Sequence, residues 1–317
     1  MGKMEDILEE IALLLCRRKV IPTFIVKELA QNNKKRMGEY SNSAYKAFLR
    51  CLFNSYQIEY IHDSYGGNIK VLINFLNQSR VMTGYTYEED TAYVIERFVK
   101  PGDVVLDVGA NVGAIALILA KKVAPSGKVY AFEPGLNNFS FLWKNLNLNP
   151  ELKKVTLPIN LGLSDCKGEL SYVEDSRNRG NGTLVNIDDK NYWSTSFLEN
   201  YGLKETIETV SLTTIDSFFD EYPISRLDFI KIDVEGMEYN VIKGGGDIIK
   251  KFRPIIQYET VNVRNLEEMH GKPVYLLIEN FLKDLSYSLY QIQDNTIVQT
   301  SYPDYSKNTL AIPSSVR

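Results

Sequence analysis

The segment that most constrains the fold is an apolar stretch followed by a short loop with two glycines. Residues 104–108 are apolar apart from Asp107, residues 109–113 begin and end with glycine, and an apolar helical pattern continues to residue 123. A buried strand that turns through such a loop into a helix places backbone N–H groups at the helix N-terminus, beside a bound ligand. The segment therefore predicts a doubly wound α/β domain with a ligand site at this turn.

The chemistry of the loop separates two kinds of nucleotide-derived ligand. A dinucleotide-binding G-x-G-x-x-G motif would need glycines where the chain has Asn111 and Ala114. Asp107, at the mouth of the loop, would repel a phosphate. The same carboxylate can accept a hydrogen bond from the α-ammonium group of a methionyl moiety and lie beside a sulfonium cation. These residues favour S-adenosylmethionine over a dinucleotide such as NAD.

A second acid follows the next predicted strand, residues 128–132. Glu133 and Pro134 come about twenty residues after Gly113. An acid at this position can bind both hydroxyls of a ribose, and the proline ends the strand. The alternative interpretation makes Asp107 a helix cap and Glu133 a surface acid. We expect the cofactor to be bound by Asp107, Gly109, Ala110, Asn111, Gly113, Glu133 and Pro134.

Strand and helix patterns alternate from residue 86 onward. Repeated strand–helix–strand units imply a parallel sheet with helices on both faces. Residues 167–209 form an insertion that is part hairpin and part loop. The expected strands are residues 104–108, 128–132, 155–160, 229–233 and 255–259, the expected helices are residues 88–98, 112–123 and 137–147, and antiparallel strands at 287–293, 296–300 and 308–313 close one edge.

The N-terminal part of the chain has a different pattern. We predict a small α+β appendage over residues 1–84 and the cofactor domain over residues 85–317. The appendage is expected either to cover the site from one side or to form a homodimer contact. Its expected elements are helices at residues 4–15 and 43–53 and strands at 57–62 and 69–73, joined by a turn at 63–67.

Four segments together resemble the FkbM family of methyltransferases. They are residues 107–113, 132–134, 227–236 and 308–313, and the resemblance covers roughly residues 85–313. It implies the seven-stranded, Rossmann-like methyltransferase fold, S-adenosylmethionine as cofactor, and methylation of hydroxyls on sugars or natural products. It also implies that Tyr87 and Glu88 lie near the cofactor, and that Asn160 and Leu161, at the end of the third strand, lie near the adenine.

Methyl transfer to oxygen requires an in-line approach and an acceptor for the hydroxyl proton. Asp233 and Glu235 end the fourth strand, at the edge of the sheet where ligands bind, and Asp233 is also counted among the cofactor contacts. Glu259 ends the next strand, and His270 is a reserve candidate. Glu238 is interpreted instead as an acid that complements a helix dipole. The acids could alternatively hold Mg²⁺, but the resemblance does not imply it, and no metal is predicted.

Composition limits the possible binding partners and the cellular compartment. The chain of 317 residues has 36 Lys and Arg against 40 Asp and Glu, so it does not encode a general electrostatic affinity for nucleic acid. Its three cysteines are too few and too scattered for a disulfide framework, which suits a cytoplasmic protein. The apolar run at residues 11–15 is too short to span a membrane, so no stable insertion is expected. The expected partner is a small hydroxylated molecule, a sugar or glycosylated natural product.

Three other functions fit parts of the pattern. An RNA or protein methyltransferase would use the same cofactor fold, but the chain lacks the Asp/Asn-Pro-Pro-aromatic motif of base-amine methylation. An NAD-dependent oxidoreductase conflicts with Asp107 and Asn111. A binding protein with an inactive cofactor fold would leave the acids at the strand ends without a role.

Overall fold

The computed structural model describes residues 59–64, 69–74, 88–175, 182–185, 205–234, 236–259, 274–293, 296–300 and 308–314. The chain divides into two units, one of residues 1–89 with 177–180 and the other of residues 90–176 with 181–317. In the first unit, β1 (Glu59–Ser64) and β2 (Ile69–Asn74) pair antiparallel, with Ser64 opposite Ile69. The helices predicted at residues 4–15 and 43–53 lie outside the described residues. The proposed boundary after residue 84 stays a prediction.

The second unit is built on an eight-stranded sheet in the order β13-β12-β14-β11-β10-β3-β4-β5. The strands from β11 to β5 run parallel, whereas β14, β12 and β13 pair antiparallel at one edge. The doubly wound α/β prediction is confirmed, and β13 lies where a strand is predicted at residues 296–300, which gives one strand more than the seven-stranded fold that the family resemblance implies. The strands are β3 (Val104–Val108), β4 (Lys128–Phe132), β5 (Thr156–Ile159), β10 (Phe229–Ile232), β11 (Ile255–Glu259), β12 (Tyr287–Gln293), β13 (Thr296–Gln299) and β14 (Asn308–Pro313).

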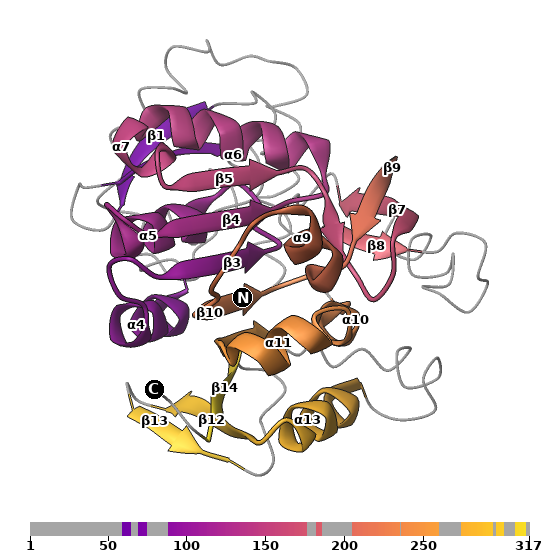
Figure 1. The fold of residues 1–317 in the computed structure, drawn as a ribbon. Helices are drawn as coiled ribbons and strands as arrows, with labels where there is room; N and C mark the ends of the chain where they lie inside the picture. The colour runs from indigo at the N-terminus through magenta and orange to yellow at the C-terminus, as the bar shows by residue number, and fades with distance from the viewer. Residues whose placement is uncertain are drawn as a thin grey trace, which may run out of the picture. The chain divides into compact units, whose positions relative to one another are not determined.

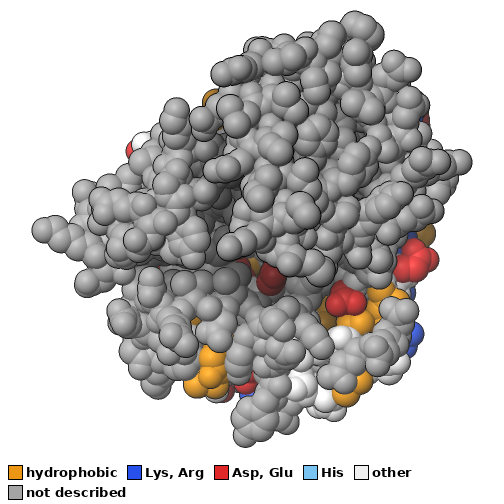
Figure 2. All heavy atoms as spheres, turned by 180° about the vertical axis from the view of Figure 1, so that it is seen from behind, with side chains coloured by type: hydrophobic (Ala, Val, Ile, Leu, Met, Phe, Trp, Pro, Cys, Tyr) orange, Lys and Arg blue, Asp and Glu red, His pale blue; other side chains and the backbone are white. Residues whose placement is uncertain are grey.

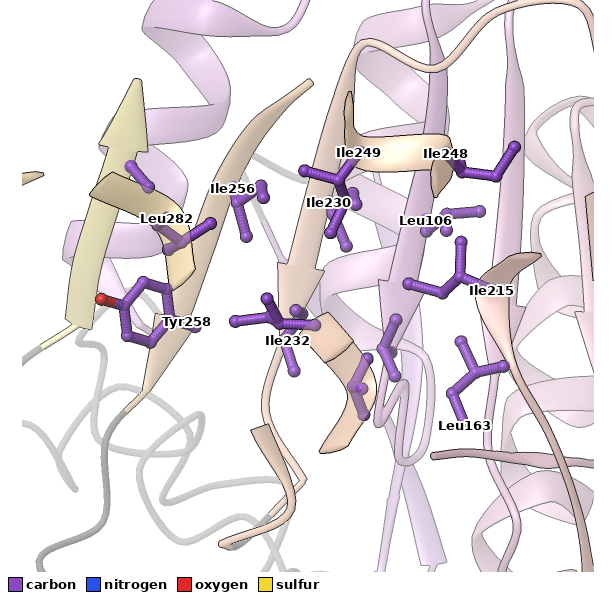
Figure 3. Close-up of a cluster of buried hydrophobic side chains, with 14 of the residues drawn as sticks. Leu106, Leu163, Ile215, Ile230, Ile232, Ile248, Ile249, Ile256, Tyr258 and Leu282 are labelled. Carbon is purple, nitrogen blue, oxygen red and sulfur yellow. The ribbon is translucent and has the colours of Figure 1, made fainter. Parts of the chain in front are cut away.

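Helices cover both faces of this sheet (Figure 1). Along each parallel strand, alternate side chains point to opposite faces. Leu106, Ile230 and Ile256 belong to one buried cluster with apolar residues of α9, α10, α11 and α13 (Figure 3). On the other face, α5 packs on β3 and β4. The helices are α4 (Glu89–Phe98), α5 (Ala114–Val123), α6 (Leu136–Leu148), α7 (Pro150–Lys153), α9 (Ile215–Glu221), α10 (Glu238–Lys243), α11 (Gly246–Phe252) and α13 (Val274–Asp284).

The central strand β10 is buried on both of its faces. All four of its residues are buried, because β3 and β11 flank it and helices cover both faces. A short strand that is buried on both faces is typical of a parallel sheet. Lys231 is the one charged residue in this strand, so its burial needs a specific partner.

The insertion between the third and fourth parallel strands forms a second sheet. Its order is β6-β9-β7-β8, in which β7 pairs antiparallel with both β8 and β9. Tyr172 and Leu212 pack in its core with Met237, which precedes α10. Residues 176–181 and 186–204 of the predicted insertion lie outside the described residues. The strands are β6 (Gly162–Leu163), β7 (Gly168–Asp175), β8 (Gly182–Val185) and β9 (Glu205–Thr213).

The described surface seen from behind is mixed in character. Figure 2 shows hydrophobic side chains with acidic and basic ones beside them toward the lower edge of that view. In the described part of the chain, no helix has both the length and the apolar character needed to cross a membrane.

Candidate cofactor and methyl-transfer site

The strand order reverses direction between β3 and β10. From β3 the chain continues to β4 and β5 on one side, whereas from β10 it continues to β11 on the other. In open α/β sheets, ligands bind beyond the carboxyl ends of the strands at such a point. Asp107 of β3 lies directly opposite Lys231 of β10 in the pairing register. Both residues are buried, so two ionisable residues of opposite type occupy neighbouring positions in the sheet, at the point where the fold places a ligand.

The glycine loop is shaped by close contacts on both of its sides. Gly109 has a φ of 79°, and a Cβ there would overlap the backbone carbonyl oxygen of Asp233. Gly113 has a φ of 87°, and a Cβ there would lie 2.5 Å from Leu142 Cδ1. L-residues with side chains rarely adopt such φ values. The two glycines are therefore required by the backbone conformation and by the close approach of neighbouring segments.

The end of β4 holds this loop in place. The backbone N–H groups of Gly109 and Ala110 both donate to the carbonyl oxygen of Phe132, at 3.0 and 2.8 Å. Asn111 follows in the left-handed region, with a φ of 52°, a conformation that asparagine tolerates better than most residues. Gly113 then becomes the N-cap of α5. The helix consequently begins at Ala114 instead of the predicted residue 112.

Glu133 connects the two loops that follow β3 and β4. Its Oε2 accepts a hydrogen bond from Asn111 N at 2.8 Å, and its Oε1 accepts one from Gly135 N at 2.9 Å. The residue is only 3% exposed, so its interpretation as a surface acid is wrong. Asp107 is fully buried within β3. Both acids therefore lie inside the protein, where a charge needs specific partners.

The end of the third strand is tied to the same region. The side-chain Nδ2 of Asn160 donates to the carbonyl oxygens of Glu133 and Pro134, at 2.9 and 2.8 Å. Leu161 is half-buried and packs against the main hydrophobic cluster. Asn160 thus braces the segment that carries Glu133. The contact of Asn160 and Leu161 with an adenine stays a prediction.

Asp233 has a partner that the sequence analysis did not identify. Lys231 Nζ donates to Asp233 Oδ2 at 3.0 Å, and the two side chains are 5% and 24% exposed. A charge-assisted hydrogen bond of this kind fixes the orientation of the carboxylate. The only sequence signal for this pair is a lysine inside an otherwise apolar central strand. Asp233 itself is partly accessible, as a group that reacts with a substrate must be.

Glu238 is a second residue whose environment differs from the prediction. It lies in the first turn of α10, as expected for an acid that complements a helix dipole, but it is buried. Its Oε1 accepts hydrogen bonds from Val234 N at 3.3 Å and Gly236 N at 3.1 Å. Burial raises the pKa of the Glu238 carboxyl to about 7, and the nearby Asp233 acts in the same direction. Glu238 therefore closes the loop that begins with Asp233.

Glu259 ends β11, as predicted. Ile232 pairs with Tyr258, so Asp233 and Glu259 are the next residues of two neighbouring strands. Two residues before Glu259, the buried side chain of Gln257 bonds to helix α4. Gln257 Nε2 donates to Thr91 Oγ1 at 2.8 Å, and Asn308 Nδ2 donates to the same oxygen at 3.3 Å. The structure thus brings polar side chains to the carboxyl ends of both β10 and β11.

Several predicted site residues are not placed by the structure. Tyr87, Glu235 and His270 lie outside the described residues. Glu88 lies in the turn before α4 with a φ of 50°, but it belongs to the first unit, so its relation to the glycine loop stays a prediction. Among the residues that the structure describes, no group of three or more His, Cys, Asp or Glu side chains could hold a metal ion.

The sheet order and the glycine loop define a Rossmann-like α/β fold. The family model for the methyltransferase FkbM domain matches residues 107–289, which is more than half of the chain. The chain therefore belongs to the FkbM methyltransferases.

Two curated relatives show the extent of the similarity. The methyltransferase sdnD of Sordaria araneosa is 32% identical over 157 residues, covering 44% of this chain and 59% of the relative. The hexuronic acid methyltransferase AglP of Haloferax volcanii is 30% identical over 157 residues, covering 50% and 56%. The matches thus span somewhat more than half the length of each relative. Among solved structures, the FkbM methyltransferase of Methylobacillus flagellatus KT is similar with a TM-score of 0.42 and 12% identity, over 87% of this chain and 56% of that one.

Proposed function

We propose that this protein transfers the methyl group of S-adenosylmethionine to a hydroxyl of a small polar molecule, a sugar or a glycosylated natural product. One observation carries the proposal. The glycine loop bonded to Glu133 follows β3, and the Lys231–Asp233 ion pair lies at the end of the adjacent strand β10, at the switch point of the sheet. The family resemblance favours a hydroxyl as the acceptor, and the relative named for a hexuronic acid supports a sugar.

The residues present fit S-adenosylmethionine. Asp107, near the end of β3, would accept from the α-ammonium group, and the glycines at 109 and 113 let the loop pass close to Asp233 and to Leu142 of α6. Glu133 would accept from the ribose hydroxyls. An ionised carboxylate accepts up to about four hydrogen bonds, so the bonds from Asn111 and Gly135 are compatible with this role. When bound, S-adenosylmethionine supplies an electrophilic methyl group on a sulfonium.

Asp233 is the favoured acceptor for the proton of the substrate hydroxyl. An alcohol is a poor nucleophile until a base removes its proton, and the base must lie within hydrogen-bond reach of it. Lys231 orients the Asp233 carboxylate, which stays partly exposed. Glu259 is the last residue of the neighbouring strand β11. It is the first alternative as the base, followed by Glu235 and His270. Lys231 acts as a positioning residue in this scheme, because it donates to Asp233 from a buried position.

The cofactor part of the proposal is tested by calorimetry. Asp107→Ala and Glu133→Ala are each expected to weaken binding of S-adenosylhomocysteine by about 1.5–3 kcal/mol, because each removes a hydrogen bond between a ligand group and an ionised side chain. Glu169→Ala, which changes an exposed acid on β7, should bind like the wild type. Tight binding of NAD, with no response to S-adenosylhomocysteine or S-adenosylmethionine, would exclude the cofactor assignment.

A further inference from the structure

Helix α6 begins directly after the loop that carries Glu133, and its N-terminus lacks a local cap. The N-cap residue is Gly135, and no side chain of the N-cap position bonds to the helix. The first N–H groups of any helix have no partner within the helix. Here two acids from other positions accept from this turn. Glu133 Oε1 accepts from Gly135 N, and Glu208 Oε1, on β9 of the second sheet, accepts from Leu136 N at 2.9 Å.

Tyr172 of β7 contacts the same turn from the second sheet. A Cβ added to Gly135 would lie 2.5 Å from Tyr172 Cε1 and 2.9 Å from its hydroxyl oxygen, so the ring lies directly against the Gly135 backbone. The φ of Gly135 is −66°, which any residue can adopt. Glycine is therefore needed here because of the ring and not because of the backbone angle. The Tyr172 hydroxyl also accepts from Asn138 Nδ2 of α6 at 3.4 Å.

Tyr172 and Glu208 form one structural element. They are direct partners in the antiparallel pairing of β7 and β9, so their side chains project from the same face of the second sheet. One packs against the turn before α6, and the other caps the helix that follows. The Tyr172–Glu208 pair thus contacts the turn at Gly135, through the Tyr172 ring, and at Leu136, through the Glu208 carboxylate.

This segment in turn fixes the carboxylate of Glu133. Gly135 N donates to Glu133 Oε1, while Asn111 N holds the other oxygen from the glycine loop. A shift of the turn at Gly135 would therefore rotate or translate the Glu133 carboxylate relative to the glycine loop. A displacement of about 1 Å is enough to weaken a hydrogen bond considerably. Glu133 thus depends on the second sheet for its position.

We propose that Tyr172 and Glu208 are positioning residues for the ribose end of the cofactor site, so that the second sheet sets the affinity for the cofactor without touching it. This inference rests on the proposed function, in which Glu133 accepts from the ribose hydroxyls. It assigns to the insertion a role in cofactor binding. The pair acts through two contacts with the backbone of the turn, the Tyr172 ring on Gly135 and the Glu208 carboxylate on Leu136.

The test compares two ligands in matched variants. Calorimetry measures the affinity for S-adenosylhomocysteine and for its 2′-deoxy analogue in the wild type, Glu208→Ala, Glu208→Gln and the control Glu169→Ala. Glu208→Ala is expected to weaken S-adenosylhomocysteine binding roughly threefold to tenfold, in the range of a lost helix cap. The 2′-deoxy analogue should lose less affinity, because its contact with Glu133 is already incomplete. Glu208→Gln keeps an acceptor oxygen and should recover part of the loss, whereas Glu169→Ala should have no effect.

The outcomes separate this inference from the proposed function. A wild type that prefers S-adenosylhomocysteine over the 2′-deoxy analogue, combined with equal losses for both ligands in Glu208→Ala, would show a general structural effect and overturn the inference alone. Unchanged binding in Glu208→Ala would also overturn it alone. A wild type without any preference between the two ligands would overturn both the ribose role of Glu133 and the inference that depends on it. Tyr172→Phe, which keeps the ring against Gly135, should stay close to the wild type.

Discussion

Replacing Asp233 by asparagine is expected to leave cofactor binding unchanged and to lower turnover by about 10²–10⁴-fold, the usual contribution of a general base. The amide keeps the shape of the side chain and can still accept from Lys231, but it cannot take the hydroxyl proton. Turnover is measured as labelled methyl incorporated into a carbohydrate-rich metabolite pool, and cofactor affinity is measured by calorimetry on the same preparations.

The control for this variant is Asp220→Asn, which changes an exposed acid in α9 and should keep full turnover. Glu259→Gln is measured in parallel, because Glu259 ends the strand beside Asp233. Full activity of Asp233→Asn together with a large loss in Glu259→Gln would transfer the base to Glu259. Full activity of Asp233→Asn, Glu235→Gln and Glu259→Gln would contradict the assignment of the base to these acids.

Glu238 is expected to make stability depend on pH. Its carboxyl is buried, and its pKa rises from 4.5 to about 7 in the folded protein. The folded state therefore binds this proton more tightly than the unfolded state does. The resulting stabilisation is complete below the unfolded pKa of 4.5 and is lost as the pH rises through about 7. Between pH 4.5 and 8, this one group should lower the free energy of unfolding by about 3 kcal/mol, since one pKa unit corresponds to about 1.4 kcal/mol.

The measurement is chemical denaturation of the wild type and Glu238→Gln at pH 5 and pH 8. Glutamine can still accept from Val234 N and Gly236 N, but it carries no charge to bury. Glu238→Gln should therefore lose less stability than the wild type between the two pH values, with Glu169→Gln as the exposed control. The same pH dependence in the wild type and Glu238→Gln would show that Glu238 does not titrate in this range.

The sequence predicts best those features that depend on neighbouring residues. The strand at residues 104–108 and the glycines at 109 and 113 follow from local pattern, because an apolar run ends where the backbone needs left-handed φ values. The spacing to Glu133 then follows from the length of one helix and one strand. The start of α5 differs by two residues, because Gly113 is the N-cap and takes a φ that a helix does not use.

The features that the sequence does not predict depend on contacts between distant segments. Leu136 and Glu208 are 72 residues apart, and their hydrogen bond exists only because the second sheet packs on the turn before α6. Lys231 is visible as a charge in an apolar strand, but its partner depends on how the chain leaves β10. The burial of Glu238 likewise depends on the loop after β10 folding back toward α10. Pairwise packing of this kind leaves no periodic signal in one sequence.

The most direct test of the account is the fate of the methyl group. Purified protein is incubated with S-adenosylmethionine labelled in its methyl group and, in separate reactions, with a carbohydrate-rich metabolite pool, RNA or a protein extract. Mass spectrometry then locates the label. We expect label on a hydroxyl oxygen of a small carbohydrate-containing molecule, and loss of that label in Asp233→Asn. Label found only in RNA or on protein side chains would contradict this expectation.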